Sequence, residues 1–353
     1  MLAAVLAWFG LAAAPAIPLS DTSPGAIDHA RSLWLLGCLA VVTGWLATRE
    51  PWLACIGAWF LWRWRVGDVP LDAKPVAALV SWAGVGVTWW AARSLPLELL
   101  GWLPWAWIAL AWAHTVVMAW QHWRHGRRNH AHGWLGQRSI AAGLYVLTIP
   151  FCPWWALPGP LLGFWLTGPS WGALVALVPA VVWLLPLSWL PWAAGGLLMA
   201  VLAGRGLSRA IIRGRYAFEW TPRGDSLDSL RVRWLAVRIA WEEIRYERRW
   251  LWGEGPGTMP LTTRRWAARL RDPSWYLAKG DLHMEPVQIV YEYGVLGVAA
   301  MALFAWEVGG RMTWGDPWSS AALAGAVFAC STYALRVAPL GVLWLAIAAG
   351  VGR

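Results

Sequence analysis

The chain has 353 residues, of which 59% are hydrophobic and only 14% are charged, and its mean hydropathy is +0.46. Soluble domains usually carry about 25% charged residues and about 45–50% apolar ones. This difference excludes an ordinary soluble enzyme, a disordered chain and a coiled coil, and it predicts an all-α polytopic membrane protein.

Apolar segments long enough to form membrane helices recur along most of the chain. A bilayer core of about 30 Å needs about 20 apolar residues per helix. The segments that predict spans are 2–19, 32–48, 75–92, 99–120, 286–306, 317–335 and 337–351, with a shorter stretch at 51–62. Residues 139–204 contain no Asp, Glu, Lys or Arg, and their length predicts three more helices. The total is about 10–11 transmembrane helices.

The charged residues divide the chain into three regions. Residues 205–285 hold 16 of the 29 basic residues and 10 of the 19 acidic ones. They separate an N-terminal transmembrane bundle, 1–204, from C-terminal transmembrane helices, 286–353. Positive charge confined between apolar spans is not the pattern of a nucleic-acid-binding protein, so nucleic acid is excluded as a partner. The lipid bilayer is the expected surroundings instead.

The basic loop 121–138 predicts the orientation of the chain. It contains four arginines and no acidic residue, which is typical of a cytoplasmic loop. Three crossings after it would place residues 205–285 outside as one long, partly helical segment, since long segments cross the membrane largely regardless of charge. Four histidines in this region have no Cys, Asp or Glu beside them, which favours a solvated loop over a metal site; they are His122, His125, His130 and His132.

The outer segment 205–285 carries an amphipathic pattern followed by a glycine-rich turn. Apolar residues spaced by three and four predict a helix over 227–250; they are Leu227, Leu230, Trp234, Val237, Trp241 and Ile244. A helix of this kind also commonly lies on the membrane surface or packs against its neighbours, and that alternative stays open. After it, Gly253, Gly255 and Gly257 form a turn whose backbone N–H groups could approach an anion closely.

The last polar motif enters an apolar span. Pro286 fits the first turn of a helix, so His283 is expected just before that helix, at the membrane edge. Gln288 and Glu292 are four residues apart and share one helical face. A glutamate inside an apolar span is a functional candidate by default, and its alternative role is a structural hydrogen bond to a neighbouring helix.

Together, these residues resemble the O-antigen ligase and O-antigen polymerase superfamily of bacterial membrane glycosyltransferases. That family carries an arginine-containing outer segment, a glycine turn and an H-N-x-x-L-Q-x-x-x-E-x-G-x-x-G stretch entering a membrane helix. The last stretch reads here as His283, Met284, Val287, Gln288, Glu292, Gly294 and Gly297, with Met284 in place of the family's Asn. Ser208-Arg209 and Arg231 or Arg233 resemble the family's arginine positions, so the likeness covers about residues 200–305.

The resemblance implies transfer of a glycan from a polyprenyl-diphosphate carrier to a glycan, lipid or protein hydroxyl at the outer face of the bacterial inner membrane. Arg209 and Arg231, with Arg233 and Arg213 as reserves, are expected to bind the diphosphate, because a departing diphosphate needs fixed cations near it. His283 is expected to act as the general base. Three residues are expected to support the site: Glu285, Gln288 and Glu292. The scheme uses no metal and no other cofactor, and other envelope-glycan assembly proteins are further expected partners.

Two functions from other classes remain open at this point. A transporter or flippase for a lipid-linked or anionic solute would suit broken helices and a glutamate in the membrane. A non-catalytic scaffold in envelope assembly would need none of the proposed chemistry. The sequence does not separate ligase from polymerase, nor does it identify the sugar or the acceptor.

Overall fold

The computed structural model describes residues 2–13, 85–86, 88–125, 133–135, 138–167, 171–189, 237–246, 250–255, 285–330 and 338–353. Within these ranges the regular structure is helical, and no strand occurs. The expected all-α class is therefore confirmed for the part of the chain that the structure describes. The total number of transmembrane helices stays a prediction.

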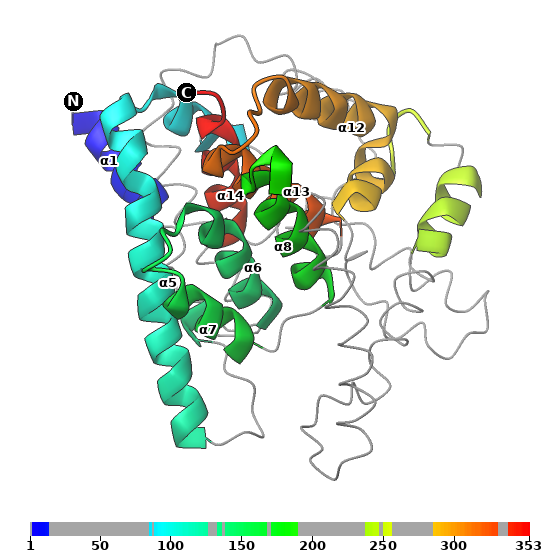
Figure 1. Cartoon of the computed structure of the whole chain (residues 1–353). Coiled ribbons are helices and arrows are strands. Elements are labelled where there is room, and N and C mark those ends of the chain that lie inside the picture. Colours follow the sequence, from blue (N-terminus) through cyan, green and yellow to red (C-terminus); the bar gives the residue numbers. More distant parts are fainter. Residues whose placement is uncertain are drawn as a thin grey trace.

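Two of the described helices are long and apolar enough to cross a membrane, by length and composition. They are α5 (Leu97–His125) and α12 (Glu285–Gly309). α5 is a single continuous helix of 29 residues, somewhat longer than the predicted span 99–120. In Figure 1 it runs along one side of the molecule and extends past the ends of its neighbours.

Between residues 139 and 204, where three membrane helices are expected, the structure describes α6 (Arg138–Thr148), α7 (Pro158–Leu166) and α8 (Trp171–Leu184). Residues 168–170 and 190–204 lie outside its described part. At 1.5 Å per residue, none of these three helices is longer than about 21 Å, which is less than the bilayer core. Pro158 is the first residue of α7 and fits its first turn, whereas Pro179 lies inside α8. The placement of 121–138 and 205–285 on opposite sides therefore stays a prediction.

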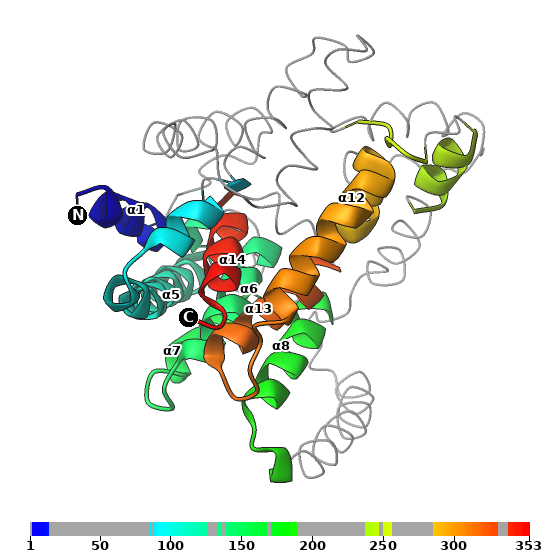
Figure 2. The same ribbon diagram turned by 90° about the horizontal axis from the view of Figure 1, so that it is seen from above.

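The core of the described bundle is built around α14 (Ala338–Gly350). α14 packs on α13 (Pro317–Ala329) and on α6, and α13 also packs on α8. Figures 1 and 2 show α14 close to these helices in both views. A helix that is apolar all round is expected to be buried, and Leu340, Leu343 and Ile347 are indeed almost fully buried.

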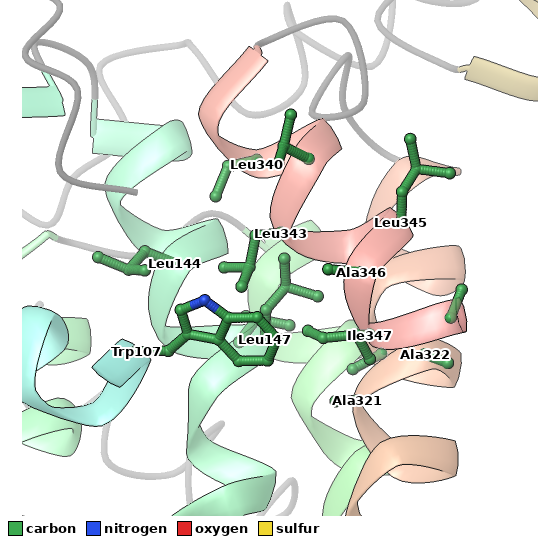
Figure 3. Packing of buried hydrophobic residues seen from close by; sticks show 14 of the residues in the cluster. Trp107, Leu144, Leu147, Ala321, Ala322, Leu340, Leu343, Leu345, Ala346 and Ile347 are labelled. Atoms are coloured by element: carbon green, nitrogen blue, oxygen red, sulfur yellow. The ribbon is translucent and has the colours of Figure 1, made fainter. Parts of the chain in front are cut away.

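Small residues allow these helices to approach closely. Gly325 of α13 lies against the ring of Trp344, and the indole N–H of Trp344 donates to the Ala322 carbonyl at 2.9 Å. Gly143 of α6 similarly faces Leu340 and Phe328. Figure 3 shows how Trp107, Leu144, Leu147 and α14 residues fill the space between the helices.

α1 (Leu2–Ala13) packs against α5, which also bears a row of exposed tryptophans. The indole N–H of Trp8 donates to the Leu99 carbonyl at 2.8 Å, which fixes α1 on α5. Trp102 and Trp123 are 62% and 82% exposed, and they lie about 30 Å apart along the helix axis at 1.5 Å per residue. This spacing matches the bilayer core, with an aromatic residue near each interface. The exposed face of α5 is therefore suited to contact lipid.

Candidate functional site

The candidate residues divide into those that the structure describes and those outside its described part. Arg209, Arg231, Arg233, Gly257 and His283 lie outside the described residues, so their predicted roles stay predictions. Glu285 is the first residue of α12, but its side chain is outside the described part. Those that can be placed are Gly253, Gly255, Gln288 and Glu292.

α12 is not a continuous helix, because its backbone leaves the helical conformation at Gly294. The φ and ψ angles there are 59° and −143°, a combination that glycine adopts readily and other residues rarely do. Figure 1 shows the result as a sharp bend between the first part of α12, in gold, and the rest, in orange. A break in a helix leaves N–H and C=O groups without partners in the helix. Those groups must be satisfied from elsewhere.

The segment 250–255 supplies these partners. The Glu254 N–H donates to the Tyr291 carbonyl at 2.8 Å, and the Gly255 N–H donates to the Glu292 carbonyl at 3.0 Å. In the opposite direction, the Val295 N–H donates to the carbonyl of Trp250 at 3.0 Å. Two motifs that are far apart in the sequence therefore meet. We call this contact between residues 250–255 and 291–295 the turn–helix junction.

On each side of the junction, one position has room for no residue larger than glycine. Gly253 has a φ of 65°, and a Cβ atom there would overlap the carbonyl of Glu292. A Cβ atom on Gly294 would lie 2.5 Å from the Trp250 oxygen and 2.7 Å from the Gly253 nitrogen. The two backbones approach each other more closely than any side chain would permit.

Glu292 lies beside the junction, inside the molecule. It is fully buried, and its Oε1 accepts a hydrogen bond of 2.8 Å from the Gln288 side-chain amide, which is also buried. The two residues share a face, as their spacing predicts. The hydrogen bond orients the carboxylate. Because it is fully buried, Glu292 can support the packing at the junction from inside the molecule.

The amphipathic segment is helical over residues 237–246. Ile244 is buried, together with Ile239, Ala240 and Glu243, whereas Trp241 is 54% exposed. The alternative that the apolar face lies on the membrane surface therefore stays open. The ring of Trp241 packs edge-on against Trp250, with ring centroids 5.1 Å apart. Through this contact, the helix 237–246 touches the segment that forms the junction.

A second buried polar group, centred on His114, has no counterpart in the sequence predictions. Nδ1 of His114 lies 2.9 Å from the Tyr145 hydroxyl, which is 3.0 Å from the hydroxyl of Thr115. Thr115 also donates to the carbonyls of Ala111 and Gly159, so α5, α6 and α7 meet here. The available signal was a single histidine inside the apolar run 99–120, and an ionisable residue in a membrane segment is unusual.

The described residues contain no group of three His, Cys, Asp or Glu side chains that could hold a metal ion. Most of the basic loop with its histidines lies outside those residues, so the expected absence of a metal stays a prediction.

Comparison with protein-family models finds no family that matches the chain, and comparison with curated proteins finds no match. The resemblance to the O-antigen ligase and polymerase superfamily therefore depends on the motif residues themselves.

Proposed function

We propose that the chain is a glycosyltransferase of the O-antigen ligase or polymerase type, with about 10–11 helices across the bacterial inner membrane. It would move a glycan from a polyprenyl-diphosphate carrier to an acceptor hydroxyl at the outer face. One observation carries the proposal: the glycine turn and the Gln288–Gly294 stretch, which the resemblance singles out separately, are joined by backbone hydrogen bonds.

The proposed chemistry needs a base, cations and a way to hold the acceptor. His283 would take the proton from the acceptor hydroxyl while its oxygen forms a bond to the sugar. The bond between the sugar and the diphosphate breaks, and its electron pair leaves with the diphosphate, whose charge Arg209 and Arg231 would neutralise. Glu292 is fully buried and accepts a hydrogen bond from Gln288, so it would support the site from inside the molecule.

The proposal is tested with purified protein in liposomes that contain a polyprenyl-diphosphate-linked glycan. The acceptors are a lipid-linked core, a growing glycan and a protein with free hydroxyls. The extended product is separated, and its mass is measured by mass spectrometry. We expect one acceptor class to be extended, and this result also separates ligase from polymerase. We expect His283→Ala to lower the rate by about 100-fold or more, the usual contribution of a general base.

His122→Ala is the matched control, because His122 lies near the C-terminal end of α5 and is only half buried. It should transfer glycan at the unaltered rate. Full transfer by His283→Ala would contradict the assignment of the base, and extension of none of the acceptors would contradict the proposed function.

A transporter or flippase is the second candidate, and the broken helix favours it. Discontinuous membrane helices and buried carboxylates occur at the solute sites of transporters; the break at Gly294 beside the buried Glu292 shows both features. The same liposomes distinguish the two functions. A transporter would move the lipid-linked glycan between leaflets, detected by its accessibility to an added glycosidase, with no change in its mass.

A further inference from the structure

We infer that the turn–helix junction is a positioning element, in which Gly253 and Gly294 set the direction of the first part of α12, the helix that His283 precedes in the sequence. The kinetic side of this inference rests on the proposed function. The structural side, that residues 250–255 hold the break in α12, can be tested without any activity.

The bend of α12 is set by residues outside the helix. The carbonyls of Tyr291 and Glu292 and the N–H of Val295 all pair with the segment 250–255. If that segment moved away, these groups would lose these hydrogen bonds, and a buried backbone group is costly to leave without its hydrogen bond. The angle between the two parts of α12 therefore depends on the glycine turn.

The geometry of the helix amplifies a small change at the break. The first part of α12 runs from Glu285 to Gly294, so a rotation of about 10° at Gly294 would move its start by about 2 Å at a rise of 1.5 Å per residue. His283, which lies outside the described residues, precedes this start by two residues in the sequence, so the proposed base is the group that such a shift would affect first. A misplacement of about 1 Å can lower a reaction rate by about 100-fold.

The junction also contacts the outer helix. The ring of Trp241, on the helix 237–246, packs against Trp250, whose carbonyl accepts the hydrogen bond from Val295. In the sequence, this helix follows Arg231 and Arg233, the proposed diphosphate-binding residues. The junction thus connects the helix 237–246, which follows the proposed cations in the sequence, to α12, which follows the proposed base.

The test compares two junction variants with two matched controls. Gly253→Ala and Gly294→Ala each place a Cβ atom into the opposite backbone. Gly309→Ala changes the same helix where nothing lies within 4 Å of an added Cβ, and Gly315→Ala places alanine at a φ of 82° with equally open space. The second control measures the effect of backbone strain without contact at the junction.

Amide hydrogen exchange is the first measurement, because it needs no substrate. In the unaltered protein, we expect the amides of Glu254, Gly255 and Val295 to be protected. In Gly253→Ala and Gly294→Ala, we expect their exchange to be about tenfold faster or more. The controls should leave it unchanged. Equal exchange in all four variants would overturn the structural side of the inference.

The kinetics of glycan transfer are the second measurement. Each junction variant should lower kcat by about 100-fold, while KM for the donor stays within about twofold, as expected when only the reacting group is misplaced. The double variant should be no slower than either single variant, because both changes break the same contact. Additive losses, or an unchanged kcat despite faster exchange, would overturn the positioning role while leaving the proposed function standing.

A milder pair of variants covers the case in which the alanine variants do not fold. Trp241 is on the surface, so Trp241→Ala should fold, loosen the contact with Trp250 and lower kcat by about tenfold, and Trp241→Phe should restore most of it. Equal kcat in both variants and the unaltered protein would count against the role of this contact. If the unaltered protein transfers no glycan, the proposed function fails and the positioning role falls with it, whereas the exchange results still decide whether the junction exists.

Discussion

Tyr145 of α6 lies in a buried hydrogen-bond network that also includes α5 and α7. It is fully buried, and its oxygen lies within hydrogen-bonding distance of His114 in α5 and Thr115 next to it, which in turn bonds the Gly159 carbonyl of α7. Buried polar groups are costly to leave without partners. The direct role of this hydroxyl is therefore to stabilise the packing of α5, α6 and α7.

We expect Tyr145→Phe to lower the free energy of unfolding by about 1–3 kcal/mol, because His114 and Thr115 lose a buried partner. Thermal unfolding in detergent measures the effect. Tyr246→Phe is the control, since Tyr246 is 64% exposed, and it should unfold at nearly the unaltered temperature. Equal unfolding temperatures for the two variants would contradict a stabilising role for the Tyr145 hydroxyl.

At the scale of single residues, the sequence predicted which side chains share a helical face better than it predicted what those side chains contact. Gln288 and Glu292 share a face because four residues bring side chains together on any helix. The pattern places Trp241 on the apolar face of its helix, but it does not reveal the contact with Trp250, because Trp250 lies outside that helix. His114 has its partners on α6 and η2 (Gly133–Leu135), which no spacing within α5 reveals.

Among the helices, α13 and α14 are in close contact in the core. Gly325 faces the ring of Trp344, and a Cβ atom at this position would overlap the ring. We expect Gly325→Ala to destabilise the protein by about 1–3 kcal/mol, the usual cost of overpacking. Gly101→Ala, on the exposed side of α5 with no atom within 4 Å, should instead stabilise it by up to about 1 kcal/mol through helix propensity.

Thermal unfolding of the two glycine variants measures both effects in one experiment. Their opposite signs separate packing from propensity, because both variants add the same methyl group to a helix. A higher unfolding temperature for Gly325→Ala would show that α13 and α14 are not in close contact there.

At the scale of elements, the sequence located the helices but not the interruption in α12. The predicted spans 99–120, 286–306 and 337–351 each overlap a described helix, because apolar composition and length are local properties. The break at Gly294 depends on hydrogen bonds from residues 250–255, so it is a property of two segments together. A glycine within a helix pattern is by itself common and tolerated.

For the whole molecule, the orientation in the membrane is the prediction on which the proposed function depends. We replace Cys38, Cys55, Cys152 and Cys330 by Ala and introduce single cysteines as Asn129→Cys and Ser226→Cys. A membrane-impermeant maleimide should label Ser226→Cys in intact spheroplasts, since residues 205–285 are expected outside. Asn129→Cys should react only after the membrane is opened. The reverse result would contradict both the orientation and the proposed outer site.

The length of α5 has a consequence for the bilayer around the protein. With 29 residues, it measures about 43 Å, whereas its neighbours α6 and α7 reach about 16 Å or less. The part of α5 from Trp102 to Trp123 would fit about 30 Å of hydrocarbon with the helix upright, whereas lipids beside the short helices would have to compress. A protein of this shape would be sensitive to acyl-chain length, and it would favour the thinner regions of a membrane on the side of α7.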